Sequence, residues 1–451
     1  MKIAVIGTGY VGLTTGVCLA YIGHDVTCLD VDERKVAELS AGKIPIYEPN
    51  LDDLLEASRS RLRFTTKYEE AIPEAEVVFI AVGTPSLPDG QPDLKYLRSA
   101  AQSLGQHMGP HFTVVVNKST VPIGSGNWVG ALIRESQKTN GNGKGEYAVA
   151  SNPEFLREGA AISDSLFPDR IVIGADNEKA LTVLYNMYRP LIDQSFAAPA
   201  FSPRPENVGA VPLVSTDLAS AELIKYAANA FLATKISFIN EIGLLASRVG
   251  ADVKHVARGM GLDSRIGNRF LNAGLGWGGS CFAKDTAALV STAADYGLNM
   301  SIVAAAKTVN TSMRDRAVIR VQETLKILKG RTIAVLGLAF KPHTDDLRDA
   351  PAIDIMNKLI ERGAMLRAHD PIAMDRFRKE QPHLASSLRE SVEETVVDAD
   401  AVILTTEWPE YIDLDWKKLG DRVASKNLID TRLVLDPSSL KADGWNILRL
   451  P

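Results

Sequence analysis

The first thirty residues constrain the fold of this 451-residue chain more strongly than any other segment. An apolar run at Lys2–Ile6 stops at Gly7, residues 10–21 repeat apolar side chains with helical periodicity, and residues 25–30 form a second apolar run. A strand, a glycine-rich turn, a helix and a second strand make a βαβ unit. We therefore expect a parallel sheet that is covered by helices.

The turn has the spacing of a dinucleotide-binding site, and it reads Gly7-Thr-Gly9-Tyr10-Val11-Gly12. In this motif the first glycine permits a tight turn, the second lets a pyrophosphate approach the backbone, and the third allows close helix packing. Asp30 ends the second strand, where a carboxylate accepts a hydrogen bond from a ribose hydroxyl and repels a 2′-phosphate. A glycine-rich turn without a ligand is the alternative, and this context disfavours it. We expect NAD rather than NADP, bound by Gly7, Gly9, Tyr10, Val11, Gly12 and Asp30.

Further apolar runs indicate how the chain is divided. Those at 77–82, 114–117, 148–151 and 171–174 continue the first sheet, and the four prolines between Gln194 and Val214 indicate a linker. Residues 217–249 contain no proline and one glycine, which predicts a connecting helix about 50 Å long at 1.5 Å per residue.

The pattern of the N-terminus returns late in the chain. Residues 332–337 match 2–7, residues 365–370 match 25–30, and residues 399–406 match 75–82, in the same order. Any two parallel sheets have similar strands, but the joints recur here as well, which favours a structural duplication. The sequence therefore predicts two Rossmann-like, doubly wound α/β domains at 1–200 and 326–451, joined by a helical region at 201–325.

The second glycine turn differs from the first. Gly337-Leu-Ala-Phe-Lys341 lacks the second and third glycines, so it is not expected to bind a dinucleotide in the same way. A nucleotide at the carboxyl ends of its strands remains possible in an open α/β sheet. Lys341, Arg348 and Arg432 are candidate partners for its phosphate or base, although each taken singly is an ordinary surface charge.

Composition excludes several classes of function. With 50 Lys plus Arg against 55 Asp plus Glu, the formal charge is −5, which does not attract nucleic acid or anionic membrane. Three cysteines cannot form a disulfide framework and indicate a reducing compartment. No run of about 18 apolar residues predicts a membrane span, and the N-terminus lacks a cleavage site. We expect a cytoplasmic protein with no nucleic-acid or membrane partner.

The segment Gly276–Asp285, GWGGSCFAKD, is the most unusual stretch of the chain. Its glycines expose backbone amides beside the thiol of Cys281, and Lys284 and Asp285 follow at once. Exposed amides and a nearby lysine favour the nucleophilic thiolate. Cys18 and Cys28 lie inside apolar runs and are interpreted as buried, unreactive side chains.

Polar residues at two other places are candidates for the same site. Lys225 and Asn229 share one face of the long helix, whereas Asn240 is interpreted as structural. Residues 151–159, SNPEFLREG, follow a strand and are expected to start a helix at Pro153, with Glu154 and Glu158 one turn apart at the edge of the sheet. Thr120 has a similar edge position.

Taken together, these motifs resemble the UDP-glucose 6-dehydrogenase family over essentially the whole chain. The motifs that carry the resemblance are GTGYVGL at 7–13, AVGTP at 81–85, NPEFLREG at 152–159, ELIKYAANAFLATKISFINE at 222–241, RIGNRFL at 265–271, GGSCFAKD at 278–285 and GLAFKPHTDDLRDAP at 337–351.

The resemblance implies a two-step oxidation of the C6 alcohol of UDP-glucose with two NAD. It implies that Cys281 forms a thiohemiacetal and then a thioester, that Lys225 and Asn229 stabilise an oxyanion, that Asp285 with Thr120 activates water, and that Glu154 assists proton transfer or hydrolysis. No metal is implied. Arg265 is similar to a residue that reaches the neighbouring subunit's sugar site, which implies a homodimer or a larger homo-oligomer.

The ligand contacts that the resemblance implies are more numerous. For NAD they are Asp30, Lys35, Thr84, Thr120, Glu158, Lys284 and Arg348. For the UDP-sugar they are Glu154, Phe155, Leu156, Arg157, Glu158, Lys225, Asn229, Arg265, Phe270, Leu271, Asn272, Ala273, Gly274, Gly278 and Lys341.

Two positions depart from the family pattern, Ala283 in place of a proline and Asn50 in place of a glycine. Two alternatives stay open. One is the same chemistry on GDP-mannose or a UDP-N-acetylhexosamine. Ser280, Phe282 and residues 341–346 favour UDP-glucose over these two substrates. The other is a non-catalytic NAD-binding sensor, against which the set of Cys281, Lys225, Asn229 and Asp285 argues.

Overall fold

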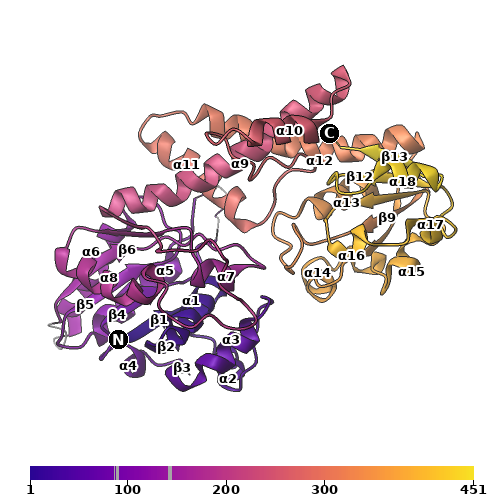
Figure 1. The fold of residues 1–451 in the computed structure, drawn as a ribbon. Helices are drawn as coiled ribbons and strands as arrows, with labels where there is room; N and C mark the ends of the chain where they lie inside the picture. Colours follow the sequence, from indigo (N-terminus) through magenta and orange to yellow (C-terminus); the bar gives the residue numbers. More distant parts are fainter. Residues whose placement is uncertain (86, 88–90, 141–144, 451) are drawn as a thin grey trace. The chain divides into compact units, whose positions relative to one another are not determined.

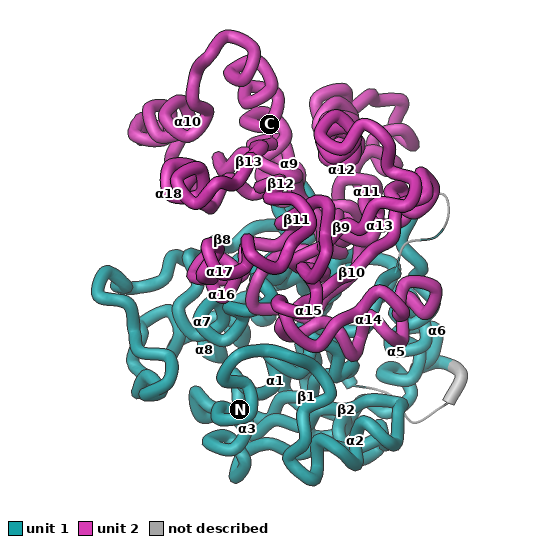
Figure 2. Tube along the Cα trace, turned by 90° about the vertical axis from the view of Figure 1, so that its right-hand side faces the viewer, with its two compact units in different colours: residues 1–228 teal, residues 229–451 magenta. Residues whose placement is uncertain are grey.

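The computed structural model describes residues 1–85, 87, 91–140 and 145–450 (Figure 1). The chain divides into two compact units, residues 1–228 and 229–451 (Figure 2). The division falls within the long helix α9 (Leu218–Val249).

The first unit is built on one sheet, which in the described residues has the strand order β3-β2-β1-β4-β5-β6-β7-β8. All neighbours are parallel except β6 and β7. The strands are β1 (Lys2–Ile6), β2 (Asp25–Leu29), β3 (Leu62–Thr65), β4 (Val77–Ile80), β5 (Thr113–Asn117), β6 (Tyr147–Ser151), β7 (Ile171–Ala175) and β8 (Leu213–Thr216).

Helices cover both faces of this sheet, because consecutive residues of its central strands are buried and mostly apolar, so that both faces are hydrophobic. Ile3 and Val5 of β1 face one hydrophobic core, whereas Ala4 and Ile6 face another. The first core is completed by α1 (Tyr10–Tyr21), α3 (Leu51–Ser58), α7 (Ala161–Leu166) and α8 (Glu178–Ile192), and the second by α4 (Tyr68–Ala71), α5 (Lys95–His107) and α6 (Ser125–Asn140). The unit also contains α2 (Glu33–Ser40) and the 3₁₀ turn η1 (Arg59–Arg61).

The predicted linker at 194–214 is wrong at its end. Residues 213–216 form β8, which pairs in parallel with β7 from Ile171↔Leu213 to Gly174↔Thr216. The four prolines of the segment concealed this strand, since proline is a poor strand residue but Pro212 immediately precedes β8. Strand β3 was also absent from the prediction, because LRFT is short and half polar.

The second unit has a parallel sheet of order β10-β9-β11-β12-β13 in its described residues. Its strands are β9 (Thr332–Leu336), β10 (Met365–His369), β11 (Ala401–Leu404), β12 (Asn427–Asp430) and β13 (Asn446–Arg449). The helices of this part of the chain are α13 (Pro351–Glu361), α14 (Met374–Glu380), α15 (Val392–Val396), α16 (Pro409–Ile412), α17 (Trp416–Leu419) and α18 (Pro437–Ala442), with η2 (Ala385–Ser387). The two sheets share the order of their first strands, β2-β1-β4-β5-β6 in one and β10-β9-β11-β12-β13 in the other.

The register of the two sheets repeats as well. The pairs Lys2↔Asp25 and Ile3↔Val77 in the first sheet correspond to Thr332↔Met365 and Ile333↔Ala401 in the second. These are the offsets of the three matching sequence segments, so the similarity in sequence reflects a repeated strand arrangement and not strand composition alone.

Helices α10 (Val253–Gly261), α11 (Ser280–Asp295) and α12 (Ser301–Leu325) follow α9. In the part of the chain that the structure describes, α9 alone is long and apolar enough to cross a membrane by length and composition, although no membrane-crossing helix is predicted from the sequence. Its Glu222, Lys225 and Asn229 are buried and have polar partners within the protein. Buried polar side chains with partners inside the protein are typical of a helix that packs against other parts of a folded chain.

Candidate active site

The glycine turn before α1 has the shape that its sequence predicts. Gly7 has φ +96°, and a Cβ there would lie 2.7 Å from the carbonyl oxygen of Ala81. A Cβ on Gly12 would lie 1.9 Å from the carbonyl oxygen of Gly7, so helix and turn touch at this point. Gly9 is exposed, and a Cβ there would meet nothing within 4 Å. The turn therefore leaves bare backbone at the N-terminus of α1, which fits a dinucleotide pyrophosphate.

Asp30 is fixed beside this turn. Its Oδ2 accepts hydrogen bonds from the Thr8 amide at 2.8 Å and the Thr8 hydroxyl at 2.7 Å, and Lys35 Nζ lies 3.1 Å away. Burial alone would raise the pKa of Asp30, but these donors and the Asp32 amide lower it below its ordinary value. The carboxylate is therefore charged where an adenosine ribose would lie.

In the glycine turn of the second unit, Asp370 accepts hydrogen bonds from two backbone amides of the turn. Asp370 Oδ2 accepts from the amides of Leu338 and Ala339 at 2.7 and 3.0 Å. Because Ala339 stands where the first turn has Gly9, this turn lacks the bare backbone of the first one. The difference agrees with the expectation that only the first turn binds a dinucleotide.

Residues 152–160 contradict the predicted helix start at Pro153. No helix includes any of residues 152–160, and α7 begins at Ala161, so Glu154 and Glu158 are not one helical turn apart. Side chains satisfy the backbone of the loop instead: Glu154 Oε2 accepts from the Leu156 amide at 2.6 Å, and Asp164 accepts from the Arg157 amide at 2.8 Å. Local side-chain hydrogen bonds of this kind compete with helix formation.

Glu154 and Lys225 form a buried ion pair with Nζ···Oε1 at 2.9 Å, and Lys225 also donates to the Glu154 carbonyl at 2.6 Å. The two side chains are 7% and 5% exposed. Burial alone would raise the pKa of Glu154, but the charge and hydrogen bonds of Lys225 lower it below its ordinary value. Lys225 Nζ also lies 5.4 Å from the centre of the Phe155 ring.

A small pocket lies beside this pair. It is lined by Ser119, Thr120, Val121, Ser151, Pro153, Glu222 and Lys225. Thr120 contributes its carbonyl to a hydrogen bond from the Thr84 hydroxyl at 2.9 Å, and this bond fixes the loop after β5. Both threonines thus meet at one sheet edge, as the carboxyl ends of parallel strands require.

Two residues near this pocket were missed in the sequence. Glu222 accepts from the amides of Gly124 and Gly126 at 2.6 and 2.9 Å, and burial raises its pKa. Lys118 donates to Asn152 Oδ1 at 2.8 Å, and burial lowers its pKa to about 8. Glu222 could have been identified from its position on the predicted helix, one turn before Lys225.

In the second unit, Cys281 lies in the first turn of α11 and is exposed. A thiol at a helix N-terminus is favoured in its thiolate form. One turn later, the buried Asp285 accepts a hydrogen bond from Asn229 Nδ2 at 2.6 Å, and Lys284 Nζ lies 2.8 Å from its other oxygen. Asn229 of α9 thus meets Asp285 and Lys284 of α11, the helix that carries the thiol.

The glycine-rich loop before α11 is held from several sides. Asn310 on α12 accepts from the Trp277 amide at 2.8 Å and donates to its carbonyl at 2.9 Å, and Asn240 accepts from the Gly274 amide at 2.7 Å. Gly276 is required here, since a Cβ would lie 2.3 Å from Asn310 Oδ1. The structural interpretation of Asn240 is confirmed, whereas Asn310 was missed because nothing in the sequence links it to the loop.

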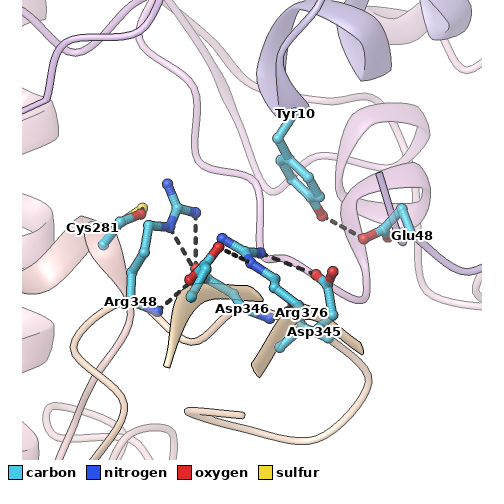
Figure 3. A network of polar contacts seen from close by, with 10 residues as sticks. Tyr10, Glu48, Cys281, Asp345, Asp346, Arg348 and Arg376 are labelled. Atoms are coloured by element: carbon cyan, nitrogen blue, oxygen red, sulfur yellow. Dashed lines mark hydrogen bonds and ion pairs between the residues drawn. The ribbon is translucent and has the colours of Figure 1, made fainter. Parts of the chain in front are cut away.

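Three basic candidates of the second unit have different surroundings. Arg348 is held by Asp346 through Nε and one terminal nitrogen, both at 2.8 Å (Figure 3). Lys341 is half-buried, with Nζ 5.4 Å from the centre of the Phe340 ring. Arg432 donates to the carbonyls of Thr405, Gly276 and Phe340 at 2.7, 3.2 and 3.2 Å, so the structure uses it to hold backbone.

The remaining predicted residues are placed as follows. Gly274 and Gly278 are packed tightly, with a Cβ meeting Thr431 O at 2.6 Å and Asp349 O at 2.5 Å respectively. Leu271 and Ala273 are buried, Asn272 is exposed, Phe270 has φ +64° and Glu158 is half-buried. Arg265 is exposed and pairs with Asp263 at 2.6 Å.

Within the described ranges, no group of three or more His, Cys, Asp or Glu side chains is placed to hold a metal ion.

The two departures from the family pattern occupy local positions. Asn50 has φ +63° just before α3, a conformation that glycine adopts freely and asparagine tolerates better than most residues. The replacement of glycine by asparagine therefore preserves the turn. Ala283 lies in the first turn of α11.

Comparison with known proteins places this geometry in a family. Models of the UDP-glucose/GDP-mannose dehydrogenase family match residues 1–192 with the NAD binding domain, 219–312 with the central domain and 334–437 with the UDP binding domain. The chain belongs to the UDP-glucose/GDP-mannose dehydrogenase family.

Individual members of the family are similar over nearly the full length. The UDP-glucose 6-dehydrogenase of Rhizobium meliloti (strain 1021) is 46% identical, covering 99% of this chain and 98% of the relative. The UDP-glucose 6-dehydrogenase TuaD of Bacillus subtilis (strain 168) is 44% identical, covering 98% and 92%. A solved UDP-glucose dehydrogenase from Pyrobaculum islandicum is 41% identical with a TM-score of 0.86, covering 96% and 94%.

The geometry at Asp30 gives a test of cofactor choice. Replacing Asp30 with Asn keeps an acceptor for the Thr8 amide but removes the charge, and it leaves Lys35 free to attract a 2′-phosphate. We expect kcat/KM for NAD to fall about tenfold to a hundredfold, and the NAD to NADP preference to fall by more than tenfold. Steady-state kinetics with both dinucleotides measure this. Asp32→Asn, at the half-buried N-cap of α2, serves as the control and should leave the preference unchanged.

Proposed function

We propose that the protein oxidises UDP-glucose to UDP-glucuronate with two NAD per turnover, through a covalent adduct on Cys281. The observation that carries the proposal is the pairing, on α11, of an exposed thiol at the helix N-terminus with a buried carboxylate one turn later that Asn229 holds. A binding protein needs neither a nucleophile nor an oriented carboxylate beside it. The match to an NAD binding and a UDP binding domain supports the two ligands.

The chemistry follows from what each residue can do. Bound NAD supplies the hydride acceptor for each of the two oxidation steps. Cys281 adds to the aldehyde formed first, which keeps the reactive carbonyl bound and positioned. Loss of the second hydride converts the thiohemiacetal into a thioester. Water then cleaves the carbon–sulfur bond, which releases the carboxylate and returns the thiol.

The supporting residues act on charge and protons. Lys225 and Asn229 lie one turn apart on α9, and we assign them to the developing oxyanion. Asp285, with Thr120, positions and activates the water that cleaves the thioester. Glu154 is fixed by its ion pair with Lys225, and in this proposal it accepts or relays a proton.

The ligand contacts are proposed on the family pattern. NAD is assigned to Gly7, Gly9, Tyr10, Val11, Gly12, Asp30, Lys35, Thr84, Thr120, Glu158, Lys284 and Arg348. The UDP-sugar is assigned to residues 154–158, Lys225, Asn229, Arg265, residues 270–274, Gly278 and Lys341.

We also propose a homodimer or a larger homo-oligomer, formed along α9. The helix exposes Leu223, Phe231, Phe238, Leu245 and Val249, which are 43%, 66%, 45%, 60% and 68% exposed. Phe231, Phe238 and Leu245 are seven residues apart, which places them on one face. A row of exposed large apolar residues is typical of an interface. In a dimer, we assign Arg265 to the sugar site of the neighbouring subunit.

The decisive experiment supplies UDP-glucose and excess NAD, and measures NADH formed per sugar consumed. We expect two equivalents of NADH and one of UDP-glucuronate. One equivalent with release of free aldehyde would remove the covalent role of Cys281. Turnover of GDP-mannose or a UDP-N-acetylhexosamine without turnover of UDP-glucose would show that UDP-glucose is not the substrate. NAD binding without turnover of any of these sugars would favour the alternative of a non-catalytic NAD-binding sensor.

A further inference from the structure

Glu48 is a buried carboxylate that none of the roles above uses. It is 5% exposed and lies in the segment between α2 and α3. Its Oε2 accepts a hydrogen bond from the Gly159 amide at 2.6 Å, and its Oε1 accepts one from the Ala161 amide at 2.7 Å. The Tyr10 hydroxyl also donates to Oε2 (Figure 3). One carboxylate thus collects three donors from two distant segments.

The two segments that Glu48 joins both belong to proposed ligand sites. Tyr10 is the first residue of α1 and part of the glycine turn. Gly159 ends the loop that begins with Asn152 and contains Glu154, and it has φ +80°. No helix or strand includes residues 152–160, and side-chain carboxylates accept hydrogen bonds from the amides of Leu156, Arg157 and Gly159 in this loop. Glu48 therefore fixes the loop end that is opposite to the Glu154–Lys225 pair.

In the contact between Tyr10 and Glu48, the phenol is the hydrogen-bond donor and the carboxylate is the acceptor. Burial, and then the charge of Glu48, raise the pKa of Tyr10, so that the phenol keeps its proton and donates to the carboxylate. Glu158, in the same loop, acts on the pKa of Tyr10 in the same direction. Hydrogen bonds to a charged acceptor are about twice as strong as neutral ones, which makes the connection stiff.

We propose that Glu48 is a positioning residue that couples dinucleotide binding at the glycine turn to the conformation of residues 152–160. A dinucleotide that orders the first turn of α1 fixes Tyr10, Tyr10 orients Glu48, and Glu48 holds the Gly159 and Ala161 amides. The identity of the second ligand, which contacts residues 154–158, rests on the proposed function. The coupling itself needs only the dinucleotide.

The first test measures amide hydrogen exchange in the full-length protein with and without NADH. In the wild type, NADH should slow exchange in peptides covering residues 152–161 as well as in the glycine turn. Tyr10→Phe keeps both backbone hydrogen bonds of Glu48 and removes only the link, so NADH should still protect the turn but no longer the loop. Tyr185→Phe removes a hydroxyl from an exposed tyrosine on α8 and should behave as the wild type. An unprotected loop in the wild type, or protection that survives in Tyr10→Phe, would overturn the proposal.

The second test measures binding of UDP-glucose with and without saturating NADH, a combination that does not turn over. We expect NADH to tighten UDP-glucose binding at least fivefold in the wild type, and less than twofold in Tyr10→Phe. Glu48→Gln places an amide N–H₂ against one of the two backbone amides, and should raise the KM for UDP-glucose about tenfold with a smaller change in the KM for NAD. Equal changes in both KM values would indicate a merely structural role. A wild type that neither binds nor oxidises UDP-glucose would contradict the proposed function, while the exchange experiment would still decide the coupling.

Discussion

Replacing Cys281 with Ala is expected to abolish formation of UDP-glucuronate, with a loss in kcat on the order of 10⁴-fold or more. In the scheme the thiol holds the aldehyde as the thiohemiacetal that the second oxidation requires, so this step cannot proceed efficiently without it. NAD binding should be unchanged, since the glycine turn lies in another part of the fold. The measurement is NADH production together with chromatographic detection of the acid.

The same residue can be tested chemically. Burial raises the pKa of both Cys18 and Cys28 to about 12, whereas Cys281 is exposed at a helix N-terminus. We expect iodoacetamide at pH 8 to label one thiol per chain and to inactivate the enzyme in proportion. Ser280→Ala, beside the thiol, should change turnover by no more than a few fold. Full activity in Cys281→Ala, or label on Cys18 or Cys28 in the native protein, would contradict the covalent step.

Replacing Lys225 with Met is expected to have the second largest effect. It removes a proposed oxyanion donor, for which a loss in kcat of about 10²- to 10³-fold is typical. It also leaves the buried carboxylate of Glu154 without its ion-pair partner, which should lower the free energy of unfolding by about 3 kcal/mol at pH 7. Lys43→Met, at an exposed lysine of the same unit, should alter neither quantity.

The pH dependence of this variant has a definite sign. The lowered pKa of Glu154 means that its ion pair stabilises the fold above about pH 4.5, and that this contribution is lost as the pH falls through the folded-state pKa. The stability difference between wild type and Lys225→Met should therefore be smaller at pH 4 than at pH 7 in urea denaturation. Adding Glu154→Gln to Lys225→Met should recover part of the loss, because the unpaired charge is removed. A difference that grows towards low pH would refute this account of the pair.

Much of the fold was predictable because it depends on local patterns. The five-residue apolar runs, the glycines at their ends and the intervening helical periodicity predicted the α/β sheets, and the repeated segments predicted a structural duplication, which the shared register of the two sheets reflects. Strand β8 was missed because its prolines and polar residues suit a linker, and pairing with β7 compensates for that composition. The loop at 152–160 was mistaken for a helix start because Asp164 and Glu154 satisfy its amides in ways that periodicity cannot reveal.

The candidate site was predictable to a different degree. Lys225 and Asn229 were identified from helical spacing alone, and Cys281 and Asp285 from their unusual surroundings in sequence. Glu48 and Asn310 were not singled out, although each holds the backbone of a loop that carries residues assigned to a ligand or to the thiol segment. Each acts on backbone amides 33 or more residues away, and a contact with backbone leaves no trace in the identity of the residue it contacts.

The sequence by itself therefore determined the repeated βαβ architecture and the dinucleotide turn with its acid, since these depend on spacings of a few residues that local geometry converts directly into shape. It also predicted Cys281 as the nucleophile. The tertiary structure decided which partners those residues have. It paired Glu154 with Lys225, Asp285 with Asn229, and Tyr10 with Glu48. Such pairs form between segments that only the packing of sheets and helices brings together, and burial gives them their strength, so no local pattern can specify them.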